Sequence, residues 1–294
     1  MTLLQHMTQF ARSYATRMGP AIKRLGIPDV RHIIAVASGK GGVGKSTSAV
    51  NLAVALARNA GLSVGLMDAD VYGPSIPRMM NLAGEPRTDE SGKLYPLQNF
   101  GVKCMSMGFL MKDDKAAVWR GPMVMSAIDT FINKVKWGAL DVLVIDMPPG
   151  TGDAQLSISQ RLSLSGAVMV STPQDIALID ARRGATMFRN VRVPILGIIE
   201  NMSYYQCPNC GHQQHIFGRD GAKRTAEDFN MELLGQVPLE MSIRETSDAG
   251  SPIVVSQAES REAQVYAKIA ARVKQKLDRY ADLQTDQQEA RAKA

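Results

Sequence analysis

The sequence is poor in cysteine, in aromatic side chains and in long apolar runs. Among its 294 residues are three cysteines, Cys104, Cys207 and Cys210. This odd and low count argues against a disulfide framework and favours a reducing compartment. No apolar run approaches the ~20 residues of a membrane-spanning helix, so we expect no integral membrane segment. Hydrophobic residues still make up 45% of the chain, which is typical of a globular protein with a sizeable core.

Acidic residues are absent from the first 28 positions, which contain Arg12, Arg17, Lys23 and Arg24. An acid-free stretch with hydroxyl residues between apolar ones is typical of an organelle transit peptide. We therefore interpret residues 1–28 as a mitochondrial presequence or disordered extension; an ordinary extension of a bacterial, cytoplasmic protein is the alternative. The rest of the chain has 30 basic and 28 acidic residues. This nearly neutral body argues against nucleic acid as a partner.

One glycine-rich run, residues 38–47, indicates the broad class of the protein. It reads Gly-x-x-x-x-Gly-Lys-Ser from Gly39 to Ser46. In such a loop the glycines turn backbone N–H groups onto phosphate oxygens, Lys45 adds a positive charge, and the Ser46 hydroxyl can hold Mg²⁺. An apolar, strand-like run precedes the loop and a helical pattern follows it, as a phosphate loop requires. The predicted nucleotide-binding residues are Gly39, Lys40, Gly41, Gly42, Val43, Gly44, Lys45, Ser46 and Thr47.

Strand-like and helical segments alternate along most of the chain. The predicted strands cover residues 32–38, 62–70, 102–108, 141–146, 166–172 and 194–201. The predicted helices lie near residues 46–58, 122–136, 155–163 and 175–190. This alternation predicts an α/β fold with a mostly parallel sheet flanked by helices. Functional side chains should then lie at the carboxyl ends of the strands.

A single domain accounts for the body of the chain. We predict a P-loop ATPase domain over residues 29–283, with an insertion carrying the cysteine pair near residues 202–217. Residues 82–100, with their glycines, prolines and charges, are expected to be a surface excursion. Apolar residues every four positions predict a packed amphipathic helix from about residue 260 to 283, followed by a frayed polar tail over residues 284–294.

Carboxylates follow the predicted strands at the positions where a nucleotide site needs them. Asp146 ends a buried strand, where Mg²⁺ is commonly held beside a phosphate loop. Asp68 and Asp70 end a second strand and are candidates to orient water or reach the metal. Asn201 ends a third strand and is a candidate adenine contact, although a strand-end asparagine is also common in turns. The chain has no Asn-Lys-x-Asp guanine motif, which favours ATP over GTP.

These motifs together resemble a known class of nucleotide-binding proteins. The phosphate loop with its inner Lys40, Asp68-Ala-Asp70 and the run Asp146 to Asp153 resemble the deviant Walker A ATPases of the nitrogenase iron protein and MinD class. Asp-Val-Tyr-Gly-Pro-Ser-Ile-Pro, Trp-Arg-Gly-Pro-Met and the downstream Cys-x-x-Cys resemble the Mrp/ApbC family within that class. Its mitochondrial, nucleotide-binding-protein-like branch, which serves complex I assembly, is the most similar.

The resemblance implies several properties of the chain. It implies a P-loop NTPase fold, slow ATP hydrolysis and a homodimer in which Lys40 reaches the nucleotide of the partner subunit. It assigns catalytic roles to Lys40, Lys45, Asp68, Asp70 and Asp146. It also implies a location in the mitochondrial matrix.

Cys207 and Cys210 are three positions apart, so they can bind one metal centre with two thiolates. A tetrahedral site or a four-iron cluster needs four ligands, and Cys104 lies in a predicted strand, where a buried inert thiol is expected. A second subunit can supply the same pair again across a twofold axis. The family resemblance implies such a bridging, labile 4Fe–4S cluster. Zinc held with His212 and His215, or a redox-active dithiol, are the alternatives.

The sequence thus predicts an ATP-binding carrier that delivers a 4Fe–4S cluster to apo-proteins, foremost subunits of respiratory complex I. One alternative is a positioning ATPase of the MinD/ParA kind, in which the cysteine pair has no function. A zinc-binding P-loop ATPase is another. Nitrogenase-like electron transfer is a third, although it uses two separated cysteines instead of one close pair.

Overall fold

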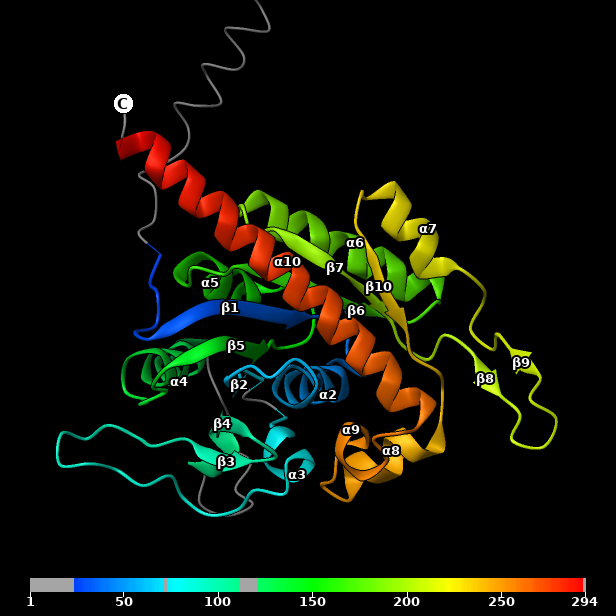
Figure 1. Ribbon diagram of the computed structural model, residues 1–294, viewed down its shortest axis with the longest axis horizontal. Coiled ribbons are helices and arrows are strands. Elements are labelled where there is room, and N and C mark those ends of the chain that lie inside the picture. Colours follow the sequence, from blue (N-terminus) through cyan, green and yellow to red (C-terminus); the bar gives the residue numbers. More distant parts are fainter. Residues whose placement is uncertain (1–23, 71–72, 111–120, 293–294) are drawn as a thin grey trace, which may run out of the picture.

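The computed structural model describes residues 24–70, 73–110 and 121–292 (Figure 1). The expected presequence lies outside the described residues up to position 23. Residues 24–28, assigned to that extension from the sequence, already belong to the body. The backbone N–H of Leu25 donates to the Arg161 carbonyl over 2.7 Å, and Ile27 is 4% exposed in the core. The packed body therefore includes residues before the predicted start at residue 29.

An eight-stranded sheet forms the centre of the molecule, in the order β10-β7-β6-β1-β5-β2-β4-β3. Its strands are β1 (Val30–Ala37), β2 (Val64–Asp68), β3 (Leu97–Asn99), β4 (Val102–Ser106), β5 (Leu140–Asp146), β6 (Gly166–Ser171), β7 (Ile195–Glu200) and β10 (Leu233–Gln236). Neighbouring strands are parallel except β3 and β4, which are antiparallel. The central strands are continuous runs of buried apolar residues because helices cover both faces. The predicted fold class is confirmed.

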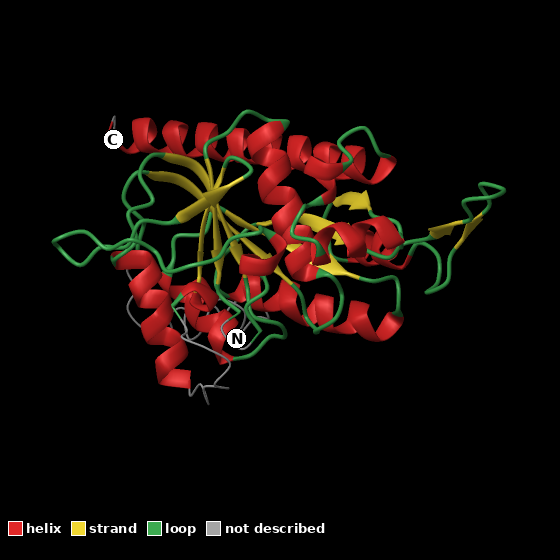
Figure 2. Ribbon diagram, turned by 90° about the horizontal axis from the view of Figure 1, so that it is seen from below, coloured by secondary structure: helices red, strands yellow, loops and turns green. Residues whose placement is uncertain are grey.

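Helices lie on both faces of the sheet (Figure 2). On one face α10 (Arg261–Ala292) packs along α2 (Lys45–Arg58). Two short helices, α3 (Ile76–Met79) and α9 (Ile253–Ser256), pack against α2, and α8 (Met241–Asp248) contacts both of them. The opposite face is covered by α4 (Gly121–Asn133), α5 (Asp153–Arg161), α6 (Asp175–Asn190) and α7 (Gly221–Asp228). A 3₁₀ turn, η1 (Met107–Phe109), follows β4. None of the described helices has the length and apolar content that a membrane crossing requires.

The direction of the chain reverses at β1, which lies between β5 and β6. The connection from β1 through α2 leads to β2 on one side, and the connection from β5 through α5 leads to β6 on the other. Such a reversal opens a crevice at the carboxyl ends of the strands, where ligands bind in open α/β sheets. The register places Asp68 beside Asp146 and Asp146 beside Val36, just before the phosphate loop.

Several segments differ from the sequence prediction. Residues 97–99, expected in a surface excursion, form the antiparallel edge strand β3, with Leu97 partly buried against the core. Strand β10 and the helices α3 and α7 to α9 were not predicted. Strand β10 has only four residues and contains an irregularity between Leu233 and Gly235. Each of these helices is too short to show a clear apolar period. The C-terminal helix also continues to Ala292 through the segment expected to be a frayed tail.

A small hairpin stands away from the body. It consists of β8 (Tyr205–Gln206) and β9 (Gln213–Gln214), which pair antiparallel and enclose Cys207 and Cys210. In both views the hairpin projects away from the rest of the molecule (Figures 1 and 2). The predicted insertion near residues 202–217 is therefore an exposed arm of the fold.

Candidate functional site

The phosphate loop connects the end of β1 to the start of α2. Gly42 and Gly44 have φ angles of 79° and 81°, in the left-handed region that favours glycine. A Cβ atom at Gly44 would lie 2.1 Å from Nδ2 of Asn201, so no side chain fits there. The first turn of α2 contains no acidic residue, so its N-terminus can accept an anion. The backbone therefore has the form of a phosphate cradle.

Helix α6 also approaches the loop closely. A Cβ atom at Gly39 would lie 2.2 Å from the backbone carbonyl of Asp180 on α6. The phosphate loop and α6 are thus in direct backbone contact. Lys40, the next residue, is exposed, and its side chain is available at the surface of the loop. Ser46 and Thr47, at the other end of the loop, are half-buried.

Lys45 is held among carboxylates at the carboxyl ends of β2 and β5. Its Nζ atom, almost fully buried, lies 2.6 Å from Oδ1 of Asp146 and 4.0 Å from Oδ2 of Asp70. The same Nζ lies 3.2 Å from Oγ of Ser46. A buried cation needs such partners, and nucleotide phosphates can replace them, since they carry the same sign of charge. Lys45 is therefore placed to leave its carboxylate partners and pair with nucleotide phosphates instead.

The second oxygen of Asp146, Oδ2, is buried and has no hydrogen-bond partner among the described residues. An orphaned carboxylate oxygen beside a phosphate loop is a natural ligand for Mg²⁺ or for a water molecule bound to it. Ser46 is half-buried close by, as its contact with Lys45 shows. These donors fit a magnesium ion, with Ser46 and Asp146 as the residues that would hold it.

Asp68 is buried beside this pair. Its Oδ2 accepts hydrogen bonds from Oγ of Ser106 over 2.9 Å and from the N–H of Ile76 over 3.4 Å. Burial, followed by the negative charge of Asp146, raises the pKa of Asp68 to about 8. The backbone N–H of Asp70 donates to Oδ1 of Asp68 over 3.1 Å. The structure thus brings Asp68, Asp70, Asp146 and Lys45 into one cluster.

Asn201 is placed against the phosphate loop. Its Nδ2 donates to the Val43 carbonyl over 2.9 Å, and its backbone N–H donates to the Ser171 carbonyl over 2.8 Å. The side chain therefore ties the end of β7 to the phosphate loop. The adenine contact expected from the sequence stays a prediction.

A fully buried carboxylate that sequence reasoning missed, Glu200, precedes Asn201. Its Oε2 accepts from Oγ of Ser203 over 2.6 Å and from Nε2 of Gln236 over 2.7 Å. Its Oε1 accepts from the backbone N–H of Ala222, at the start of α7, over 2.9 Å. Glu200 thus joins the end of β7 to β10, to α7 and to the chain entering the hairpin. An acid directly after an apolar strand was the only sequence signal for it.

Cys207 and Cys210 lie at the turn of the hairpin, one half-buried and the other exposed. The backbone N–H groups of Cys210 and Asn209, followed by the Cys210 thiol, donate toward Cys207 and lower the pKa of its thiol. The N–H of Gly211 donates to the Cys207 carbonyl over 2.9 Å, which closes the turn. A turn that directs N–H groups at one sulfur favours the thiolate, the form that binds metals.

The described residues supply no third ligand to this pair. Nowhere in the described part of the chain do three His, Cys, Asp or Glu side chains gather as a metal site. Nδ1 of His215 lies 3.1 Å from the Ser203 carbonyl, at the base of the hairpin. Cys104 is buried in β4, as predicted, and burial raises the pKa of its thiol. The zinc alternative, with His212 and His215, gains no support from this arrangement.

The fold and these two groups of residues match one protein family. The family described as NUBPL iron-transfer P-loop NTPase matches residues 29–274. The chain belongs to this family. The assignment to the Mrp/ApbC class from the sequence motifs is therefore confirmed, and the chain is a P-loop NTPase.

Relatives from mouse and Arabidopsis thaliana are similar over most of the chain. The mouse iron–sulfur cluster transfer protein NUBPL is 59% identical over 256 residues, which cover 87% of this chain and 80% of the relative. The Arabidopsis thaliana iron–sulfur protein required for NADH dehydrogenase, mitochondrial, is 57% identical over 268 residues, 91% of this chain and 85% of the relative. A nucleotide-binding protein from Archaeoglobus fulgidus, solved with ADP, is 38% identical with a TM-score of 0.70, covering 81% of this chain and 93% of that one.

Proposed function

We propose that this protein is an ATP-binding carrier of iron–sulfur clusters whose recipients are apo-proteins of mitochondrial NADH dehydrogenase. The observation that carries the proposal is the exposed hairpin, which presents two cysteines and no third ligand from the described chain. Such a site can bind a cluster and still release it. Family membership and the names of the mouse and Arabidopsis relatives support the same function.

The nucleotide is ATP, and the ADP bound by the Archaeoglobus relative supports this choice. Backbone N–H groups of the phosphate loop and the start of α2 would bind its phosphates. Lys45 would leave Asp146 and Asp70 for the phosphates, which frees Asp146 for Mg²⁺. When bound, Mg²⁺ would neutralise charge on the phosphate oxygens. Asp68 and Asp70 are the candidates to orient the attacking water, and we expect slow hydrolysis.

The cargo is a 4Fe–4S cluster held between two copies of the chain. Two thiolates from each subunit would complete the four ligands that such a cluster needs. Ile176 and Ile179 on α6 are 68% and 47% exposed. Because α6 contacts the phosphate loop at Gly39, an interface over these side chains would also lie beside Lys40. This juxtaposition supports a homodimer in which Lys40 acts on the nucleotide of the partner subunit.

The buried Glu200 network offers a route between nucleotide and cargo. Asn201 contacts the phosphate loop through the Val43 carbonyl, and the adjacent Glu200 holds Ser203 at the entry to the hairpin. A change at the phosphate loop would therefore reach the hairpin through two hydrogen bonds and the peptide bond that joins Glu200 to Asn201. We also propose that the residues before position 24 act as a transit peptide and that the carrier works in the mitochondrial matrix.

Anaerobic reconstitution with iron and sulfide tests the cargo site. The wild-type protein should develop the broad visible absorbance of a cluster, and Cys207→Ala or Cys210→Ala should abolish it. The matched control is Cys104→Ala, since Cys104 is buried in β4 and should not contribute. Unchanged absorbance in the Cys207→Ala and Cys210→Ala variants would refute the assignment. ATP-dependent binding to liposomes or DNA would instead favour a positioning ATPase.

A further inference from the structure

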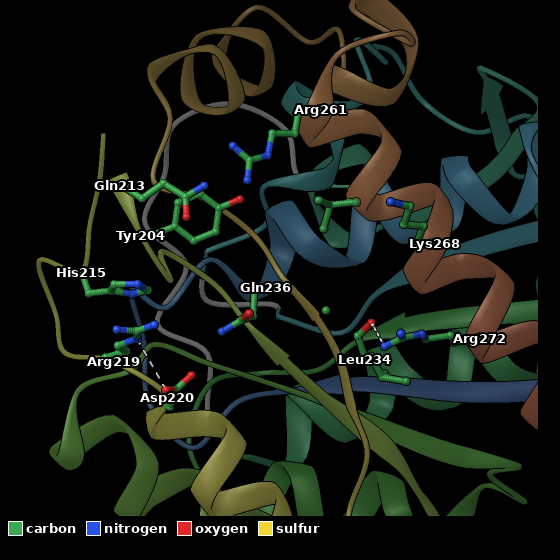
Figure 3. Close-up of a pocket in the computed structure, with 12 residues that line it drawn as sticks. Tyr204, Gln213, His215, Arg219, Asp220, Leu234, Gln236, Arg261, Lys268 and Arg272 are labelled. Carbon is green, nitrogen blue, oxygen red and sulfur yellow. Dashed lines mark hydrogen bonds and ion pairs between the residues drawn. The ribbon is translucent and has the colours of Figure 1, made fainter. Parts of the chain in front are cut away.

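A cationic pocket lies at the base of the cysteine hairpin, apart from the phosphate loop (Figure 3). Its volume is about 420 Å³, within the range of ligand-binding cavities. One wall is α10, which contributes Arg261, Lys268 and Arg272, and the opposite wall contributes Arg219. Each of these four side chains is exposed at the surface. We infer that this pocket, here called the basic pocket, docks an acidic peptide segment of the protein that receives the cluster.

The charge of the basic pocket favours a carboxylate ligand. Asp220 is the only acid among the described residues that line it, and its Oδ2 lies 3.7 Å from Nε of Arg219. Among the described carboxylates, none forms an ion pair with Lys268. Because the body of the chain is nearly neutral, this group of cations is a local feature and not a consequence of overall charge. Such a patch attracts and orients an acidic partner.

The floor of the basic pocket provides apolar surface for the stem of a glutamate side chain. Leu234 of edge strand β10 and Val265 of α10 line it. The guanidinium group of Arg272 donates to the carbonyls of Leu233 and Leu234 over 2.9 and 3.0 Å. These bonds occupy two backbone acceptors of this strand, which disfavours an added strand here, so a partner would bind through its side chains.

The basic pocket is directly connected to the cargo arm. Tyr204, Gln213 and His215 of the hairpin region line it (Figure 3). Arg261 donates a hydrogen bond to Oε1 of Gln206 and lies over the Tyr204 ring, 5.1 Å from its centroid. A peptide bound here would therefore lie at the base of the hairpin that carries Cys207 and Cys210. That position is where a recipient must approach to accept the cluster, so this inference rests on the proposed carrier function.

Binding of a short fluorescein-labelled polyglutamate peptide, measured by anisotropy, tests the inference. Lys268→Glu should weaken binding about tenfold, because it replaces an attraction in the pocket by a repulsion. The matched control is Arg279→Glu, which makes the same charge change on the same helix outside the basic pocket. It should bind like wild type. A polyglutamine peptide of equal length should not bind, and added salt should weaken polyglutamate binding.

Three results would overturn the inference. The first is equal loss of binding in Lys268→Glu and Arg279→Glu, which would indicate net charge alone. The second is unchanged binding in Lys268→Glu. The third is binding of free citrate or inorganic phosphate as tight as that of the peptide, which would indicate a small-anion site. Iron and sulfide content, measured on the wild type and both variants, separates this test from a test of the carrier function. Lys268→Glu should bind as much iron and sulfide as the wild type. A wild-type protein that binds neither would refute the carrier function, and the peptide-binding result would still stand.

Discussion

Gly44 leaves room for the side chain of Asn201 beside the phosphate loop. Gly44 has a left-handed φ of 81°, and the space that its Cβ would fill already holds the Asn201 amide. Gly92 has a similar φ of 78° but no atom within 4 Å of its would-be Cβ. Both glycines therefore need a left-handed backbone conformation, but only Gly44 lacks the space for a side chain.

Gly44→Ala should abolish ATP binding and destabilise the fold, because the new methyl group forces Asn201 away from the loop. Gly92→Ala should cost only about 1 kcal/mol of unfolding free energy, from the left-handed backbone, and leave nucleotide affinity unchanged. Titration calorimetry with ATP and urea unfolding measure the two effects. Wild-type affinity for ATP in Gly44→Ala would contradict the role assigned to this contact.

The raised pKa of Asp68 predicts an unusual pH dependence of stability. In the nucleotide-free protein its pKa is about 8, against an ordinary 3.8. Between these values the folded state keeps a proton that the unfolded chain releases, so the contribution of Asp68 to stability falls as pH rises. Asp68→Asn removes this contribution. The unfolding free energy of wild type should therefore decline relative to Asp68→Asn from about pH 4 to pH 8, and parallel curves would contradict it.

Glu200 offers a test of the hydrogen-bond route to the hairpin. Glu200→Gln replaces one carboxylate oxygen, which accepts hydrogen bonds, by an amide NH₂ group, which donates them. Because three donors already face this side chain, the change should lower the unfolding free energy by about 1–3 kcal/mol. The control Glu259→Gln changes an exposed side chain and should cost almost nothing. If the route operates, Glu200→Gln should also uncouple ATP addition from cluster release, measured by visible absorbance. Unaltered coupling would limit Glu200 to a structural role.

A functional residue could be predicted from the sequence when the pattern that identifies it lies within a few neighbouring residues. The phosphate loop carries its chemistry within one short run, so its lysine and glycines were identifiable from the sequence. Asp68 and Asp146 were identifiable because each ends an apolar strand, and the register brings them together. Glu200 and Arg261 act through partners that are distant in sequence, such as Gln236 and Tyr204. Only the folded chain shows those contacts.

Helix α6 carries two exposed isoleucines, Ile176 and Ile179, and lies against the phosphate loop. Ile176→Asp combined with Ile179→Asp should weaken an ATP-dependent dimer by at least about tenfold, since buried anchors dominate interface energies. The fold should be unaffected because both side chains are exposed. The control is Met241→Asp on α8, which is 69% exposed. Analytical ultracentrifugation with ATP measures the dimer, and equal effects of the two changes would remove α6 from the interface.

The predicted elements are those with long, regular apolar patterns. The buried strands from β1 to β7, apart from β3, and the longer helices α2, α4, α5 and α6 lie near the expected residues. Strands β3 and β10 were missed because both are short edge strands. These strands form because they pair with neighbouring strands, and the alternation of apolar and polar residues within a short segment does not reveal such pairing. The last turns of α10 are polar, so no apolar period was present from which a helix could be predicted.

The molecule as a whole separates two tasks within one body. The carboxyl ends of the central strands hold the nucleotide machinery, and the hairpin beyond β7 holds the cysteines (Figure 1). Asn201 and Glu200, consecutive at the end of β7, lie between these two sites. In the function proposed above, each chain would supply half of the ligands of the metal site, and pairing of two chains under the control of ATP would complete it.

Metal and sulfide analysis of the anaerobically purified protein, combined with its native mass, tests this account most directly. The account predicts a dimer with about four iron and four sulfide ions per two chains. It also predicts that Cys207→Ala loses both the iron and the sulfide. A strictly monomeric protein that contains zinc and no sulfide would contradict it.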